Sequence, residues 1–525
     1  MPESLRLDLR NQGLTKLQLS IHLEADYKIL DVSQNPELCD MIATKERDFD
    51  VNISDDSLEI VFASDTGFHE FPQWLLSRFP KLKMIAFKTS LIKEIPEDAF
   101  ALKNNRLAWL ILTNNDLRVL PESIGNLVHL RKLSLAGNML DNLPNNMENC
   151  QSLELLRLGN NLLKEVPDWL WRLPKLTWLG VMGNPAFPCR IHFSDISKGV
   201  SDSTETETAE KYLIGLPVYQ PGKSRASGFT TEACASIYTS DRNNDEQLEV
   251  FETKILGSGG SGRVLHGVLR SSGSFIRNVA VKLFEVSSFI PTSSRDRPLV
   301  ASDGAVENEI ELLARLGDVF RKPESDISSV EVPKNCGTLH VVGLVKNVVG
   351  AYCGVVLEVL DGYVKLGESP NFDSVTRDRF SKDCSFGDFQ KTVDIANLVT
   401  EFYQLAIQVS STLMTLAADG IFHGDLYAHN IISKRYGDSK VDVVVVDYGA
   451  ANFVQRSEDR IQFEKLEVRA FGILLDDLLD YYCPKFDYTS DELRSLQHVR
   501  NRCLDENVDK RPTFNKVVQL LSCRK

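Results

Sequence analysis

Closely spaced cysteines are absent from this sequence. The chain has 10 cysteines, and none of them stands in a CxxC pair. Zinc sites and the disulfide frameworks of small secreted domains depend on such spacings. The sequence therefore predicts neither kind of site. Scattered cysteines are typical of the reducing cytoplasm, where we expect the protein to reside.

Long apolar runs are equally scarce. The first residues alternate charged side chains with leucine, so we expect no signal peptide. The most apolar window, residues 341–360, is interrupted by Lys346, Asn347 and Glu358, which favours two buried strands over a membrane helix. We therefore predict no membrane-spanning segment.

Positive charge is in deficit. The chain has 59 lysines and arginines against 73 acidic residues, a formal net charge of -14. Surfaces that follow nucleic-acid phosphates are basic, so we expect no general binding of nucleic acid. A length of 525 residues with 43% hydrophobic and 25% charged residues predicts a soluble protein of two or more globular domains.

The first third of the chain repeats itself. Asn115, Asn138, Asn161 and Asn184 follow one another at intervals of 23 residues, each at the end of the frame L-x-x-L-x-L-x-x-N, with Val181 at the third leucine position of the last copy. This frame is the leucine-rich-repeat pattern. Because one repeat cannot bury its apolar side alone, we predict an α/β leucine-rich-repeat solenoid with a parallel sheet over residues 1–188.

Weaker copies of the frame precede these four and bring the expected total to roughly eight repeats. Their two central apolar positions and terminal polar position are Leu7, Leu9 and Gln12; Leu30, Val32 and Asn35; Ile60, Phe62 and Asp65; and Ile85, Phe87 and Ser90.

Strand alternation predicts which side chains face the concave side of the sheet. Tryptophan and arginine in such a row are typical of binding hot spots, so we predict a surface that recruits a protein substrate or regulator. The alternative is that these side chains pack on neighbouring repeats or under the following domain. The predicted partner-binding residues are Trp109, Lys132, Leu155, Arg157 and Trp178.

The periodicity stops after residue 188. Residues 189–247 are rich in Ser, Thr, Asp and Glu, as in 201–208, and we predict a polar linker. The second predicted domain covers residues 248–525. It opens with three glycines at GxGxxGxV spacing, Gly257, Gly259 and Gly262, which let a hairpin backbone approach phosphates.

A lysine and a glutamate follow in the pattern that phosphate binding requires. Lys282 ends the apolar run Val279–Val281, and Glu309 borders the inward stripe of a predicted helix. We predict that the two side chains form an ion pair. The alternative is a solvated strand end and a glutamate on an exposed helix face.

Most of the candidate catalytic and metal-binding residues lie in two short stretches. They are His423-Gly424-Asp425-Leu426-Tyr427-Ala428-His429-Asn430 and Asp447-Tyr448-Gly449. One carboxylate, Asp425, can orient a hydroxyl nucleophile, while Asn430 and Asp447 can hold Mg²⁺ against a triphosphate. The alternative is a pair of carboxylates that cap turns.

In their order and spacing these residues resemble the eukaryotic-type protein kinase family, over roughly 245–525. With the repeats, the chain is similar to cytosolic leucine-rich-repeat kinases of bacterial type. The resemblance implies an α+β two-lobed kinase domain that uses ATP and Mg²⁺, with Asp425, Lys282 and Glu309 in catalysis. The implied ATP-binding residues are Leu256, Gly257, Ser258, Gly259, Gly260, Ser261, Gly262, Val264, Ala280, Lys282, Glu358 and Leu360.

Three departures from the family pattern limit what the resemblance implies. Gly424 replaces an arginine, Tyr427 replaces a lysine, and only a short segment separates Gly449 from Glu467. We expect control without phosphorylation of that segment, and compensation for the missing lysine by nearby cations. The candidates are Lys434, Arg435 and His429.

These patterns favour a protein kinase that acts on a protein hydroxyl, serine or threonine before tyrosine. Two alternatives remain open. One is a scaffold whose second domain binds nucleotide without turnover, a pseudokinase. The other is a small-molecule phosphotransferase, since such enzymes share the His-Gly-Asp opening.

Overall fold

Two compact units make up the chain. One consists of residues 1–188 with 371–376 and 505–511, and the other of the remaining residues. The described residues of this computed structural model are 5–15, 27–39, 57–102, 105–188, 218–221, 236–241, 245–259, 262–272, 274–284, 306–319, 337–346, 352–371, 374, 376–386, 395–436, 440–483 and 490–522.

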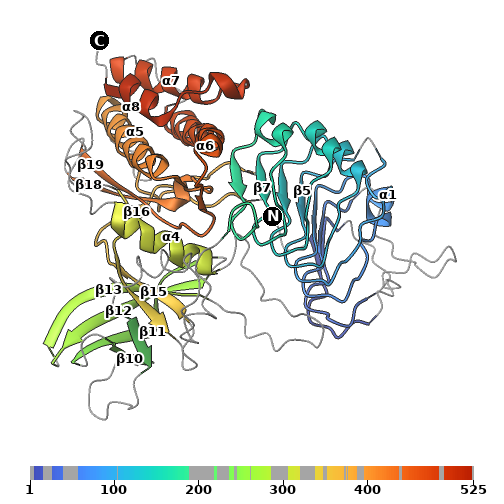
Figure 1. Cartoon of the computed structure of the whole chain (residues 1–525), viewed down its shortest axis with the longest axis horizontal. Coiled ribbons are helices and arrows are strands. Elements are labelled where there is room, and N and C mark those ends of the chain that lie inside the picture. The colour runs from blue at the N-terminus through green and yellow to red at the C-terminus, as the bar shows by residue number, and fades with distance from the viewer. Residues whose placement is uncertain are drawn as a thin grey trace. The chain divides into compact units, whose positions relative to one another are not determined.

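The first unit contains a parallel sheet of eight short strands that pair in chain order, one strand for each repeat (Figure 1). The predicted repeat solenoid is confirmed by this sheet. The strands are β1 (Arg6–Asp8), β2 (Ile29–Asp31), β3 (Ile60–Phe62), β4 (Met84–Ala86), β5 (Trp109–Ile111), β6 (Lys132–Ser134), β7 (Leu155–Arg157) and β8 (Trp178–Gly180).

Short helical turns connect these strands. The three 3-10 turns each begin directly after a proline, whose fixed φ and missing N–H suit the first position of a turn but not a strand. The described helical segments are α1 (Trp74–Arg78), η2 (Glu122–Asn126), η3 (Asn145–Asn149) and η4 (Asp168–Arg172).

Buried asparagines join successive repeats in a ladder. Asn138 is fully buried, and its Nδ2 donates to the carbonyls of Leu112 and Leu135 at 2.9 and 2.8 Å. Its Oδ1 accepts the N–H of Leu117 at 3.1 Å. One side chain therefore satisfies three backbone groups that the turns leave without a partner, which explains the regular asparagine spacing.

The predicted frame of the third repeat is wrong by one residue. Val61, rather than Ile60 or Phe62, stands in register with Leu30 and Ile85. Thr66 takes the asparagine position, where its hydroxyl donates to the carbonyl of Ala63. The two flanking positions of this strand are also apolar, so hydrophobicity alone does not distinguish the two registers.

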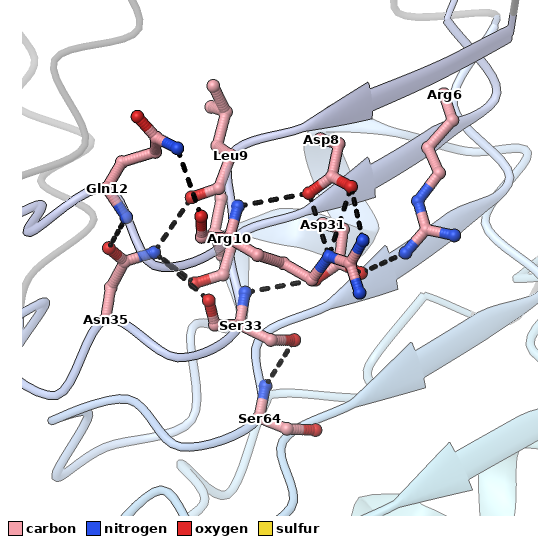
Figure 2. Close-up of polar contacts among 10 residues, drawn as sticks. Arg6, Asp8, Leu9, Arg10, Gln12, Asp31, Ser33, Asn35 and Ser64 are labelled. Carbon is pink, nitrogen blue, oxygen red and sulfur yellow. Dashed lines mark hydrogen bonds and ion pairs between the residues drawn. The ribbon is translucent and has the colours of Figure 1, made fainter. Parts of the chain in front are cut away.

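The first repeats carry a polar cluster on the sheet (Figure 2). Arg6 pairs with Asp31, and Arg10 pairs with Asp8 at 2.6 Å. Asn35 starts the ladder by accepting the N–H of Gln12 at 3.0 Å. Ion pairs thus link the charged side chains of the first two repeats.

Replacing Asn138 by alanine is expected to lower the free energy of unfolding of the repeats by about 2 to 4 kcal/mol, because three buried backbone groups lose their partner. All 5 tryptophans lie within residues 74–178, so tryptophan fluorescence during urea unfolding reports on this unit. Asn142→Ala, at an exposed site, is the control. Equal stabilities of the two variants would contradict the ladder.

The second unit contains a closed barrel (green and yellow in Figure 1) with the strand order β10-β11-β12-β13-β15-β14-β9. Its core is mainly aliphatic, with Val250, Leu265 and Val281 fully buried. The strands are β9 (Val218–Pro221), β10 (Ser236–Ser240), β11 (Glu246–Gly259), β12 (Gly262–Ser271), β13 (Ser274–Phe284), β14 (Val341–Lys346) and β15 (Tyr352–Glu358). β14 and β15 are the two strands predicted within residues 341–360.

Residues 189–247 are more than the predicted polar linker. β9 and β10 lie within this range and close the barrel, β9 against β14 and β10 against β11. Tyr219 of β9 is fully buried in the barrel core, and its hydroxyl donates to Glu246. Each strand is too short for its alternation to stand out among polar neighbours.

The rest of the second unit is mainly helical. α5 places Leu398, Phe402, Leu405 and Val409 on a buried face at helical spacing. Ser490 caps α7 by accepting the N–H of Leu493 at 3.1 Å. The helices are α4 (Val306–Val319), α5 (Ile395–Ala418), α6 (Ser457–Tyr482), α7 (Asp491–Cys503) and α8 (Phe514–Ser522), with the single turn η7 (Ala428–Asn430). The turn η8 (Val508–Lys510) is counted with the first unit.

Two small sheets accompany these helices. β16 (Val364–Lys365), β18 (Ile431–Tyr436) and β19 (Lys440–Val445) form one, and β17 (Ile421–Phe422) and β20 (Asn452–Phe453) form the other. They hold both ends of the stretch 423–430. Among the described helices, none is long and apolar enough to cross a membrane.

Candidate functional site

The hairpin of β12 and β13 sets Lys282 beside the glycine-rich segment. Val264 and Lys282 are directly paired in its register, and Gly262 is paired with Phe284. β15 lies on the other side of β13 and pairs Val355 with Lys282. The lysine therefore lies on a strand that is hydrogen-bonded on both sides, so its backbone has little freedom.

The Lys282 ammonium forms ion pairs with two carboxylates. It contacts Glu309 Oε1 of α4 and lies 3.2 Å from Asp447 Oδ1. Lys282 and Glu309 are 7% and 3% exposed, whereas the Asp447 side chain is 46% exposed. The predicted Lys282–Glu309 contact is thus present, and the structure adds Asp447 to it.

The three charges stabilise one another. Burial alone would lower the pKa of Lys282, but Glu309 and Asp447 outweigh burial and raise it. Burial raises the pKa of Asp447, but the Lys282 ammonium outweighs it and the pKa is lowered. Lys282 therefore stays an ammonium and Asp447 a carboxylate, the forms in which they attract phosphate and cations.

Arg315 links α4 to a neighbouring strand. Arg315 donates to Glu311 Oε1 at 2.6 Å, one helical turn away. The Arg315 guanidinium also lies 4.0 Å from the centre of the Phe453 ring on β20. This cation–π contact ties α4 to the segment that follows Asp447, and so keeps Glu309 facing Lys282.

Two glycines of the hairpin serve different purposes. A Cβ built at Gly257 meets no atom within 4 Å, so the backbone there borders open space. A Cβ at Gly262, which has φ +151°, would lie 2.2 Å from the carbonyl oxygen of Leu283. Gly257 permits a ligand to approach the backbone, and Gly262 permits the hairpin to form.

The other predicted residues of the hairpin are only partly placed. Leu256 is 52% exposed, and Val264 and Ala280 are partly buried on neighbouring strands. Ser258 and Gly259 end β11. Gly260 and Ser261 lie outside the described residues.

The implied ATP-binding residues Glu358 and Leu360 lie at and just beyond the end of β15. Glu358 donates its N–H to His340 at 3.1 Å, and its Oε1 accepts the N–H of His340 at 3.2 Å. A nucleotide contact by Glu358 would therefore use its carbonyl. Leu360 accepts a long hydrogen bond, 3.4 Å, from Tyr363.

Asp425 and Asn430 lie in direct contact. Asn430 Nδ2 donates to the Asp425 carbonyl at 2.9 Å and to Asp425 Oδ2 at 3.0 Å. The buried His423 joins this loop to the residue that follows β19, because its Nε2 lies 2.9 Å from the Val446 carbonyl while Nδ1 accepts the N–H of Asp425. These roles place the ring proton on Nε2.

A buried glutamate of α6 supports the start of the loop. Glu467, 4% exposed, accepts the N–H groups of His423 and Gly424. Burial raises its pKa to about 7 against the effect of these hydrogen bonds. Gly424 has φ +69°, which glycine adopts without strain and arginine does not. This conformation is a physical reason for glycine at that position.

Asp447 and Gly449 form a tight turn after β19. Asp447 has φ +62°, an uncommon conformation for a residue with a side chain. A Cβ at Gly449 would lie 3.3 Å from Glu309 Oε2 and 3.5 Å from Asp447 Oδ1. The missing side chain at 449 thus leaves room beside the two carboxylates.

The donor atoms fit Mg²⁺ in part. The protein would offer the Asp447 carboxylate and the Asn430 amide oxygen, and Mg²⁺ takes oxygen ligands and is usually completed by phosphates and water. Within the described residues no group of three or more His, Cys, Asp or Glu is arranged for a metal ion. A site of this composition would depend on a bound phosphate for the remaining ligands.

The cations near Tyr427 are mostly engaged elsewhere. Arg435 forms a two-pronged pair with the buried Glu401, and Lys434 Nζ donates to the Asp361 carbonyl at 2.8 Å. Tyr427 itself is 5% exposed and packs on the ring of His429. Of the three predicted replacements for the missing lysine, only His429 lies within the loop itself.

One residue of this region has no counterpart in the sequence-based prediction. Asp378, 9% exposed, accepts the N–H of Ala428 and contacts His429 Nδ1 at 2.9 Å. Burial raises the pKa of its carboxyl, and the hydrogen bonds from His429 and Ala428 oppose that rise. Asp378 lies in a polar segment without periodicity, so no sequence signal marks it.

The predicted concave binding surface is not exposed. Trp178 is fully buried, Leu155 and Arg157 are 3% exposed, and Trp109 is 9% exposed. Trp109 packs in a cluster with Ile60, Met84 and Ala86 from neighbouring repeats. The burial of these four side chains favours the alternative in which they pack inside the protein over an exposed binding surface.

Lys132 is the fifth predicted partner-binding residue. Its side chain is partly buried, and its Nζ lies 4.8 Å from the centre of the Trp109 ring. Lys132 therefore also packs against a side chain of the neighbouring strand.

No protein-family model matches this chain. Among solved structures, a leucine-rich-repeat protein of Leptospira interrogans is similar at 24% sequence identity, with a TM-score of 0.29. The match covers 36% of this chain and 45% of that protein. The presence of leucine-rich repeats rests on the strand register and the asparagine ladder of the chain itself.

Proposed function

We propose that the second unit is an ATP-dependent protein kinase that transfers the γ-phosphate to a protein hydroxyl. The observation that carries the proposal is the Lys282 ammonium held between Glu309 and Asp447. A buried lysine that is fixed by two carboxylates is arranged to bind phosphate oxygens, since its charge is kept and its position is determined.

The residues take the following roles in this proposal. Lys282 binds the α- and β-phosphates, and Glu309 keeps its ammonium in place. Asp425 accepts or orients the proton of the acceptor hydroxyl, and Asn430 fixes its carboxylate through the 3.0 Å hydrogen bond. Asn430 and Asp447 would hold Mg²⁺, which would supply positive charge beside the phosphates.

The control of such an enzyme would not depend on loop phosphorylation. Phe453 already pairs with β17 and packs on Arg315 without any added phosphate. α6 begins at Ser457, so only a few residues separate the Gly449 turn from this helix. A short segment that is already packed gains little from a phosphate.

The repeats would recruit a protein substrate or a regulator. Tethering raises the local substrate concentration and can compensate for a small substrate platform. The buried residues Trp109, Leu155, Arg157 and Trp178 are not part of this proposal.

Incubation of the full chain with labelled ATP and Mg²⁺ tests the proposal. We expect label to enter protein on a substrate array, and Asp447→Asn to lower the rate by about 100-fold or more because a charged contact to the reacting phosphates is lost. Asp480→Asn, at an exposed position of α6, is the control and should retain the rate.

Other outcomes favour the alternatives. Nucleotide binding with no turnover by the wild type would favour a pseudokinase scaffold. Label that enters a metabolite pool, with none in protein, would favour a small-molecule phosphotransferase.

A further inference from the structure

A carboxylate that is distant in sequence contacts the loop between Asp425 and Asn430. Asp378 Oδ2 accepts the backbone N–H of Ala428, and Asp378 Oδ1 lies 2.9 Å from His429 Nδ1. Both contacts fall on the two residues that precede Asn430. One side chain thereby restrains the backbone at one residue and the side chain at the next.

The segment that carries Asp378 is itself anchored to the helical part of the second unit. Arg377 pairs with Asp476 at 2.6 Å and with Asp477, both on α6. The Asp378 N–H donates to Asp477 Oδ2 at 3.4 Å. Two neighbouring residues thus bind the same helix, which gives the Asp378 carboxylate a fixed position.

Leu366 and Gly367 also pack against the loop. A Cβ built at Gly367 would lie 2.8 Å from Ala428 Cβ, and Leu366 donates its N–H to the Ile431 carbonyl at 2.8 Å. Two backbone hydrogen bonds join Glu368 to Arg379. They bring the neighbouring residues Gly367 and Asp378 close to each other. Leu366, Gly367 and Asp378 therefore all contact the loop or the residue that follows it.

We propose that Asp378, acting through Ala428 and His429, is a positioning residue that sets the distance between Asp425 and Asn430 for phosphate transfer. This inference rests on the proposed kinase function. Asn430 reaches the Asp425 carbonyl and carboxylate only while the residues between them keep a compact turn. The Asp378 carboxylate maintains this turn, and residues that orient the groups at a reacting centre affect the transfer step more than substrate binding.

Variants of His429 separate this role from a general effect on folding. His429→Ala removes the donor to Asp378, whereas the amide of His429→Asn can replace the Nδ1 group. We expect His429→Ala and Asp378→Asn to lower kcat by about 10- to 100-fold, the usual effect of losing a supporting hydrogen bond. KM for ATP should stay within about twofold, because the nucleotide contacts are untouched.

The conservative variant and a matched control complete the kinetic test. His429→Asn should recover most of kcat. Glu401→Gln alters another buried carboxylate, which pairs with Arg435 beyond the loop, and should leave kcat unchanged. Wild-type kcat in His429→Ala and Asp378→Asn, or an equal loss in Glu401→Gln, would overturn the proposal.

Hydrogen exchange distinguishes failure of this inference from failure of the proposed function. In the full chain, Asp378→Ala should speed exchange in peptides covering 426–430 by at least about tenfold, since the Ala428 N–H loses its acceptor. Unchanged exchange would overturn the inference whether or not the protein transfers phosphate. Faster exchange in a chain whose wild type transfers no phosphate would overturn the proposed function alone.

Discussion

Lys282→Met is expected to lower the rate of phosphate transfer by about 100- to 1000-fold, the range found when one charge-stabilising donor is removed from a reacting centre. Methionine preserves the length of the side chain and removes the charge. Two carboxylates, Glu309 and Asp447, then face each other without their shared cation. The measurement is the initial rate of label transfer from ATP, with Lys254→Met, on an exposed part of β11, as the control.

The same substitution is expected to cost stability. Removal of one partner from a buried ion pair leaves the other charge uncompensated, at a cost of about 3 to 5 kcal/mol. Glu309 is that charge, at 3% exposure. The lost rate of the single variant alone would therefore not distinguish catalysis from unfolding.

A double variant resolves this ambiguity. Lys282→Met with Glu309→Leu replaces the ion pair by apolar side chains, which is often neutral for stability. We expect the double variant to regain the thermal midpoint of the wild type and to remain inactive. A single variant that keeps its rate within about threefold, far short of the loss of a charged contact, would show that Lys282 does not contact the transferred phosphates.

The repeats show what periodicity can predict and where it stops. The 23-residue spacing of asparagines predicts parallel strands because each asparagine must reach the turns of its neighbours. The register fails at Val61, where Thr66 replaces asparagine and the flanking residues are also apolar. Hydrophobicity alone therefore does not place the frame of a repeat. The asparagine at its end is also needed.

Exposure is harder to predict than strand direction. Alternation correctly assigns Trp109 to the concave row of the sheet, but the cluster with Ile60 and Met84 buries it. Burial depends on the size of neighbours on other strands, and Met84 and Ile60 lie about one and two repeats away in sequence. A row of large side chains on adjacent strands is therefore weak evidence for a binding surface.

In the second unit, contacts between regular elements were predictable and contacts from loops were not. Lys282 and Glu309 stand at defined positions on a strand and a helix, and the structure joins them. Asp378 contacts the loop 425–430 from an irregular segment, so no periodic pattern in the sequence predicts this contact. Similarly, β9 and β10 are too short to be recognised, although the barrel closes through them.

Glu467 is expected to make the stability of the second unit depend on pH. Burial raises its pKa from 4.5 to about 7 in the folded protein. Between these values the folded state binds more protons than the unfolded state, so stability falls as pH rises. The stabilising contribution is fully present below pH 4.5 and is lost as pH passes about 7.

The expected size of this effect follows from the shift. At about 1.4 kcal/mol for each pKa unit, the loss is on the order of 3 kcal/mol. Asp477, whose pKa is also raised to about 7 by burial, adds to the same slope. The contribution of Glu467 is therefore obtained from a difference between the wild type and a variant.

Glu467→Gln is the variant that isolates the titration. Glutamine is neutral at every pH, and its carbonyl can accept the N–H of His423 as the carboxylate does. We expect the variant to gain stability relative to the wild type as pH rises from 5 to 8, by an amount on the order of 3 kcal/mol. Urea unfolding followed by far-UV circular dichroism measures it, because the long helices α5 and α6 lie in the second unit.

Two further variants test the physical cause. Glu467→Ala removes the acceptor of two buried N–H groups, so it should be destabilised at every pH by about 1 to 3 kcal/mol for each group. Glu458→Gln, at an exposed position in the first turn of the same helix, should leave the pH dependence unchanged. A stability difference between Glu467→Gln and the wild type that is constant from pH 5 to 8 would mean that Glu467 binds its proton equally in both states. The loop would then be supported by an ionised carboxylate, and burial would not control its charge.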